Sequence, residues 1–174
     1  VKYNFKQLGD IDILELINNL SKIKKSDWDT DSIRTRGKTH EKVKTLPIRW
    51  KPEVLKQTNL RQIDNTEFYD ILNFSKIESQ LLSIYKKNYG DGFIHKIILA
   101  DMHPEWTIKK HADSGLSLMS IHRTHIPLIT NPYVTFNVNG ETQQMIEGEY
   151  KQNDRCVIID DVITTGGSLQ EAID

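Results

Sequence analysis

The hydrophobic period of the sequence changes near residue 90, and this change limits the chain to folds that combine helices with a sheet. Before it, apolar residues recur at helical spacing over residues 10–25 and 75–90. After it, short runs alternate between apolar and polar residues. Asn139–Gly140 is the strongest short hairpin signal, because a tight I′ turn needs positive φ at both central residues. The pattern predicts an α+β fold, with helices flanking a β-sandwich or barrel.

Two helices and a series of short strands follow from this pattern. Asp10 is the predicted N-cap of the first helix, and Ser75 with Glu78 forms a predicted capping box at the start of the second. Asn88–Gly90 is expected to end the second helix. The predicted strands cover residues 93–100, 108–113, 123–129 and 133–138, and residues 45–50 form a further short apolar segment.

The composition points to no electrostatic partner. The chain has 174 residues, enough for one substantial core. Lys and Arg (23) nearly balance Asp and Glu (24), so we expect neither nucleic acid nor an anionic membrane as a partner. No long apolar run and no secretory leader is visible, so we expect a cytoplasmic protein. The single cysteine, Cys156, excludes an intramolecular disulfide and suits a small buried apolar role.

Residues 111–127, HADSGLSLMSIHRTHIP, carry the clearest sign of chemistry. His111 and Asp113 are two residues apart in a segment that reads as extended, and such side chains share one face of a strand. An imidazole and a carboxylate placed together supply two of the three ligands of the 2-His-1-carboxylate triad that holds non-haem Fe(II), which needs one further imidazole. A structural role is the commoner one for an isolated histidine, and it is assigned to His40, His95, His103 and His122. The pair predicts a metal site at His111 and Asp113.

The segments IKKHADSG, HRTHIPLITN, VTFNVNGE and MIEGE resemble a known oxygenase family, the aspartyl/asparaginyl β-hydroxylases. The helical N-terminal part also fits, so the resemblance covers roughly residues 1–149. The match is specific, because H-x-D followed about ten residues later by R-x-H-I-P is far more than a lone dipeptide. The resemblance implies a domain over residues 1–149 with a double-stranded β-helix, a cupin-like jelly roll, and N-terminal flanking helices.

The resemblance also implies cofactors and residue roles. Members of the family use Fe(II) and 2-oxoglutarate to hydroxylate an amino-acid side chain or a related small molecule. His111 and Asp113 are then the catalytic metal ligands, while Arg123 and His125 line the pocket for 2-oxoglutarate or substrate. A dicarboxylate needs cationic and hydrogen-bonding groups near the metal. The expected partner is a small molecule or a peptide side chain.

The sequence departs from this family after His125. Family members carry a second metal-binding histidine on a later strand, then an arginine that grips the far carboxylate of 2-oxoglutarate. All six histidines here lie at or before His125, so two ligands would hold the metal less well. Asp154 and Arg155 resemble the Asp-Arg dipeptide that contains this arginine in the family. They lie closer to His125 in the sequence than that dipeptide does in family members, so Arg155 is a weak candidate for binding the cosubstrate. We expect a β-helix that is incomplete at its C-terminus and a truncated, impaired oxygenase.

Residues 146–174 resemble a second family, the type I phosphoribosyltransferases, and orotate phosphoribosyltransferase most closely. The apolar run over residues 155–161 predicts a strand buried on both faces of a parallel sheet. The resemblance implies that two aspartates at the C-terminal end of this strand bind ribose hydroxyls and help to place Mg²⁺. The loop that follows would hold the 5′-phosphate of phosphoribosyl pyrophosphate (PRPP). The residues of this PRPP-like motif are Asp160, Asp161, Thr164, Thr165, Gly166, Gly167 and Ser168.

The two resemblances meet at the string MIEGEY, and we interpret the chain as a junction of two coding sequences. It joins an oxygenase-like domain over residues 1–149 to a PRPP-motif-like fragment over residues 150–174. An oxygenase is the leading function, a PRPP-binding phosphoribosyltransferase fragment is the alternative, and a folded fragment with neither activity is a third reading. Residues 155–161 are expected to pair as a substitute strand, with the TTGGS segment loosely held.

Overall fold

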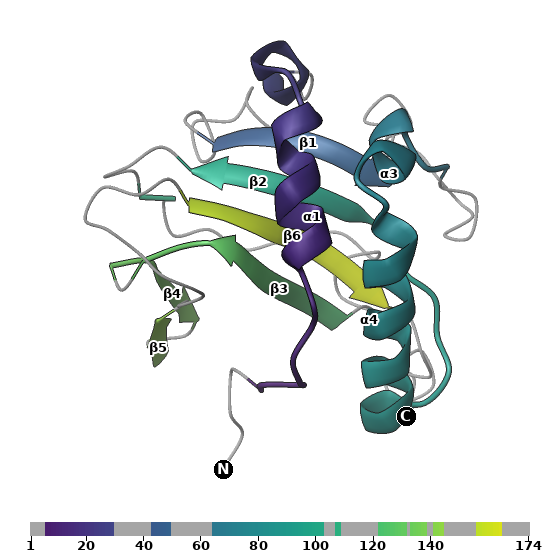
Figure 1. Cartoon of the computed structure of the whole chain (residues 1–174). Coiled ribbons are helices and arrows are strands. Elements are labelled where there is room, and N and C mark those ends of the chain that lie inside the picture. Colours follow the sequence, from purple (N-terminus) through teal and green to yellow (C-terminus); the bar gives the residue numbers. More distant parts are fainter. Residues whose placement is uncertain are drawn as a thin grey trace, which may run out of the picture.

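The computed structural model describes residues 6–29, 43–49, 64–102, 107–108, 122–131, 133–138, 141–144 and 156–164. Over residues 141–144 and 156–164 it describes the backbone and, among the side chains, that of Ile159. A four-stranded antiparallel sheet carries helices on one face, and a two-stranded hairpin lies beside it (Figure 1). These elements confirm the predicted α+β class.

The helical elements precede most of the sheet in the sequence. They are α1 (Leu14–Asn19), the 3₁₀ turns η1 (Leu20–Lys22) and η2 (Lys25–Asp29), α3 (Glu67–Ile71) and α4 (Phe74–Tyr89). The strands are β1 (Val43–Arg49), β2 (Ile97–Met102), β3 (His122–Ile129), β4 (Thr135–Val138), β5 (Glu141–Gln144) and β6 (Cys156–Thr164).

The first helix is shorter than its hydrophobic period predicts. It begins at Leu14, whose N–H donates to the Asp12 carboxylate at 3.2 Å. The predicted N-cap, Asp10, is therefore wrong by three residues, since Ile13 occupies that position. The second half of the predicted helix tightens into 3₁₀ turns, which are common at the ends of α-helices.

Helix α4 confirms the second predicted helix and its buried stripe, which includes Ile77 and Leu81. The predicted capping box does not form, because the Glu78 carboxylate binds Arg49 and Tyr69 instead. Gly90 ends the helix with φ of 92°, a conformation that glycine adopts without steric penalty.

Strand β6 lies inside the sheet, whose strand order is β1-β2-β6-β3. Ile159 pairs with Leu99 of β2 on one side and with Ile126 of β3 on the other, and both pairings are antiparallel. The prediction that residues 155–161 pair as a substitute strand is confirmed for the part within β6, and the predicted parallel sheet is wrong. An apolar run buried on both faces has the same sequence pattern in a central antiparallel strand, so periodicity alone could not separate the two.

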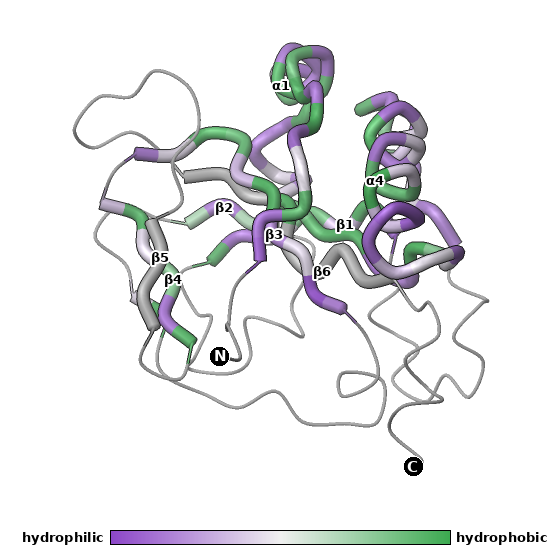
Figure 2. The backbone as a smooth tube through the Cα atoms, turned by 90° about the horizontal axis from the view of Figure 1, so that it is seen from below, coloured by the Kyte–Doolittle hydropathy of each residue, from purple (hydrophilic) through white to green (hydrophobic). Residues whose placement is uncertain are grey.

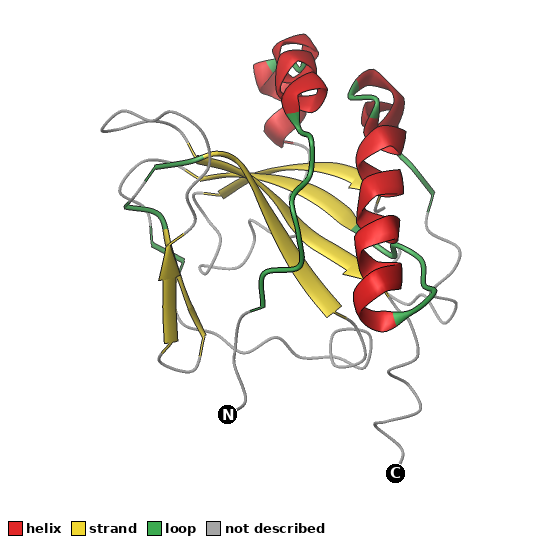
Figure 3. Cartoon of the chain, turned by 60° about the horizontal axis from the view of Figure 1, so that its bottom comes forward, coloured by secondary structure: helices red, strands yellow, loops and turns green. Residues whose placement is uncertain are grey.

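A hydrophobic core fills the space between the helices and one face of the sheet. It joins Leu16 of α1 and Leu81 of α4 to Leu46, Leu99 and Ile159 of the sheet. Figures 2 and 3 show α1 and α4 on the same side of the strands. No described helix is both long enough and apolar enough to cross a membrane.

The predicted hairpin is confirmed by the pairing of β4 with β5. Val138 pairs with Glu141, which leaves Asn139–Gly140 as a two-residue connection. The side chains of Val134, Phe136 and Val138 are half-buried, and those of Thr135 and Asn137 are exposed, as the alternation predicts. The predicted strand at 108–113 lies outside the described residues, apart from its first residue.

Candidate metal and cosubstrate site

Strand β3 presents two sets of side chains to opposite faces of the sheet. Ile126 and Leu128 belong to the core beneath the helices, and the Thr124 hydroxyl contacts the Tyr85 hydroxyl of α4. Because side chains alternate along a strand, Arg123 and His125 lie on the face away from the helices. Arg123 is exposed and His125 is half-buried. The strand thus brings a guanidinium and an imidazole to one face.

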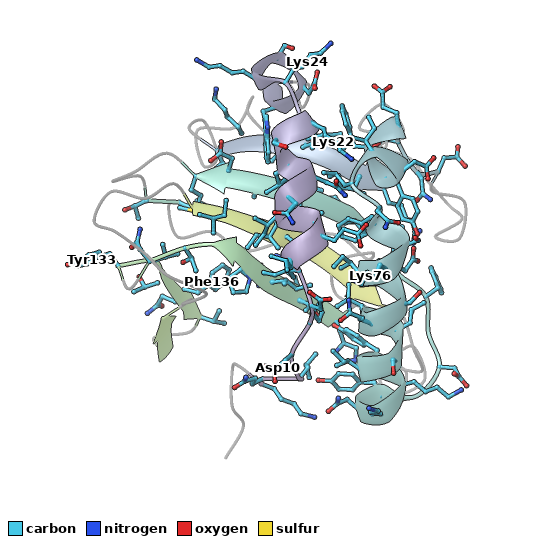
Figure 4. All side chains as sticks on the ribbon, in the orientation of Figure 1. Asp10, Lys22, Lys24, Lys76, Tyr133 and Phe136 are labelled. Carbon is cyan, nitrogen blue, oxygen red and sulfur yellow. The ribbon has the colours of Figure 1, made fainter. Side chains whose placement is uncertain are left out.

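Phe136 of β4 forms an apolar wall beside His125. The two ring centroids are 4.5 Å apart, and the planes are tilted by 43°. Figure 4 shows Phe136 between β3 and the hairpin, whereas Tyr133 points outward. An aromatic neighbour at this distance restricts the orientation of the imidazole and keeps water from one side of it. Phe136 falls within the strand predicted over residues 133–138, but the sequence does not connect it with His125, since only the fold brings the two together.

A β-bulge lies opposite His125 in strand β6. Thr124 pairs with Val162 and Ile126 pairs with Ile159, so the one residue between them on β3 faces two residues on β6, Asp160 and Asp161. One residue opposite two is the defining pattern of a β-bulge, and such bulges are frequent beside active sites. The backbone therefore brings both aspartates of the PRPP-like motif to the level of His125.

Arg123 lies near one end of the sheet. Arg123 pairs with Ile163 near one end of β6, whereas Ile129 pairs with Val157 near the other. The six residue-to-residue steps from Arg123 to Ile129 span roughly 20 Å at the rise of a strand. Arg155 precedes β6 in the sequence and lies outside the described residues, so Arg123 is the candidate arginine that the structure places.

Several predicted site residues lie outside the described part of the chain: His111, Asp113, Arg155, Thr165, Gly166, Gly167 and Ser168. Their roles stay predictions. Strand β6 continues to Thr164, so Asp160 and Asp161 lie within a strand. The prediction that they lie at the C-terminal end of a strand is wrong. Among the described side chains, no three His, Cys, Asp or Glu residues gather to hold a metal ion.

A family model for aspartyl/asparaginyl beta-hydroxylases matches residues 11–163. The chain belongs to the aspartyl/asparaginyl beta-hydroxylase family. The match passes the end of the predicted oxygenase segment at residue 149 and includes most of β6. This agrees with the place of β6 between β2 and β3 in the sheet of this hydroxylase-family protein.

The hydroxylase-family chain also contains a second, short similarity. It is 50% identical over 32 residues to the uridine 5′-monophosphate synthase of Caenorhabditis elegans. The aligned part is 18% of this chain and 6% of that protein, so the chain spans only a small part of its relative. No solved structure matches the chain. The two similarities together support the interpretation of a junction between two coding sequences.

Proposed function

We propose that this member of the hydroxylase family is an Fe(II)- and 2-oxoglutarate-dependent dioxygenase with a double-stranded β-helix core. Its substrate is an amino-acid side chain, in a peptide or in a small molecule. The observation that carries the proposal is the family match over residues 11–163, which includes the H-x-D pair His111 and Asp113. Iron held by such a pair supplies the activation of dioxygen that hydroxylation of a C–H bond requires.

Strand β3 carries side chains that suit the binding of a dicarboxylate cosubstrate. Arg123 offers a guanidinium on the sheet face away from the helices, and a guanidinium can donate two parallel hydrogen bonds to one carboxylate. His125 lies two residues further along the same face of β3, and the ring of Phe136 from β4 packs against it. Both side chains are half-buried. We assign Arg123 to binding the carboxylate and Phe136 to excluding water from it. Arg155, which precedes β6 in the sequence, is the competing candidate for the same role.

The test is iron-dependent formation of succinate from 2-oxoglutarate by the full chain. We expect activity that is low, because the chain has no histidine after His125, and that disappears in His111→Ala. Arg123→Gln should raise the KM for 2-oxoglutarate more than it lowers kcat, and Arg155→Gln should leave that KM nearly unchanged. The reverse result assigns the cosubstrate to Arg155. Succinate formation that is equal in the parent and in His111→Ala would reject the proposed function.

The match to the uridine 5′-monophosphate synthase favours one alternative, a PRPP-binding fragment over residues 150–174. In that case Asp160 and Asp161 hold the ribose and Mg²⁺, and the segment after Thr164 holds the phosphate. Saturable binding of PRPP in the presence of Mg²⁺, lost in Asp160→Asn with Asp161→Asn, would support this alternative. Lack of binding would remove it.

A further inference from the structure

Two tyrosines of α4 contact β3 on the face that packs against the helices. The Tyr85 hydroxyl forms a hydrogen bond with the Thr124 hydroxyl. One helical turn later, the Tyr89 ring stacks on the His122 ring, with centroids 4.2 Å apart and planes tilted by 21°. Four residues of a helix rise about 6 Å and two residues of a strand about 7 Å, so the two contacts match along both elements. Helix α4 therefore holds β3 at two successive positions of one face.

The backbone ladder alone holds this part of β3 weakly. Strand β3 lies at the edge of the described sheet, and residues 122–124 pair with the last three residues of β6. The register shifts directly after Thr124, at the bulge. A slip of one residue turns every side chain of a strand to the opposite face. Arg123 lies between the two residues that α4 contacts, so these contacts keep its guanidinium on the face away from the helices.

We propose that Tyr85 and Tyr89 are positioning residues for the face of β3 that carries Arg123. The inference rests on the proposed function, in which Arg123 binds a carboxylate of 2-oxoglutarate, and it adds the helix that fixes this arginine. A guanidinium donates two parallel hydrogen bonds to a carboxylate only in a matching orientation, so a small displacement of its backbone weakens binding. The tyrosines act from the helix side of the sheet and reach the cosubstrate only through β3.

The experiment measures the KM for 2-oxoglutarate and kcat of the full chain in Tyr85→Phe and Tyr89→Leu. Tyr85→Phe removes only the hydroxyl that binds Thr124, and Tyr89→Leu removes the ring that stacks on His122. We expect each to raise the KM about three- to tenfold, the loss that corresponds to one weakened hydrogen bond, and to change kcat less. Tyr89→Phe keeps a stacked ring and should restore the KM.

Two comparisons separate positioning from a general loss of stability. Tyr69→Phe is the matched control, because it also removes a hydrogen-bonded hydroxyl, but one whose partner is Glu78 of α4. It should leave the KM unchanged. In an Arg123→Gln background, Tyr89→Leu should raise the KM no further, since the tyrosine acts through the arginine. Additive effects of these two substitutions would overturn the inference.

A second readout does not need turnover. The nuclear Overhauser effect between the rings of His125 and Phe136, whose centroids are 4.5 Å apart, reports how β3 presents its far face. It should weaken in Tyr85→Phe and Tyr89→Leu and persist in Tyr69→Phe. A parental effect or a parental KM in both α4 variants would overturn the inference. If the parent forms no succinate, the proposed function fails, and the ring contact alone decides whether the tyrosines position this face. If Tyr89→Leu does not fold, Tyr85→Phe decides in its place.

Discussion

At the scale of single residues, a compact polar cluster joins β1, α3 and α4. The Arg49 guanidinium donates to both oxygens of Glu78 at 2.7 Å, and it also donates to Asn65 and to the Ile94 carbonyl. The Tyr69 hydroxyl donates to Glu78 as well. Burial alone would raise the pKa of Glu78, but the hydrogen bonds from Arg49 and Tyr69 outweigh it and lower that pKa. Glu78 is therefore an acceptor fixed by its partners, and this explains why it does not cap its own helix.

Replacement of Glu78 by Gln should destabilise the protein by about 2–3 kcal/mol, because a mostly buried Arg49 loses its counter-charge. The free energy of unfolding from urea denaturation measures the effect. Asp12→Asn, which breaks the exposed pair with Lys76, is the control and should change the midpoint much less. Equal effects of the two substitutions would contradict the role given to the cluster.

Tyr69 should make the protein sensitive to alkaline pH. Burial, followed by the hydrogen bond to Glu78, raises its pKa from 10.0 to about 12. The protonated phenol is favoured in the folded state, so its contribution to stability is complete below pH 10 and is lost as the pH rises toward 12. The free energy of unfolding should therefore fall more steeply over this range in the parent than in Tyr69→Phe. Parallel curves for the two proteins would show that Tyr69 is not held as described.

At the scale of elements, β6 decides whether the sheet is continuous. Ile159 is fully buried and touches the same core as α1 and α4. Ile159→Ala should cost about 2–5 kcal/mol, as for other large-to-small changes in a core. Ile71→Ala, at a position that is 37% exposed, is the matched control and should cost far less. A small effect at Ile159, measured by the same denaturation, would mean that β6 is not part of the folded core.

Local sequence patterns predicted several helices and strands, but they did not predict how strands far apart in the sequence pair with one another. The stripe of α4, the hairpin at Asn139–Gly140 and the strand around Ile159 follow from spacing and turn chemistry. The direction of β6 depends on β2 and β3, which lie far from it in the sequence. The level shared by His125 and the two aspartates depends on a bulge, which no period in either strand reveals.

At the scale of the whole molecule, β6 and the chain before residue 149 form one folding unit. Among the described strands, β6 alone pairs with both β2 and β3 and so joins them in one sheet. A chain ending at residue 149 would leave both strands with unpaired backbone groups, and the core would lose Ile159. We expect that truncated chain to lose cooperative thermal unfolding and to aggregate. A chain ending at residue 164 should keep one sharp transition, since it retains all of β6. Circular dichroism measures the unfolding of both chains. Cooperative unfolding of the 1–149 chain would show instead that the segment resembling a β-hydroxylase folds without β6.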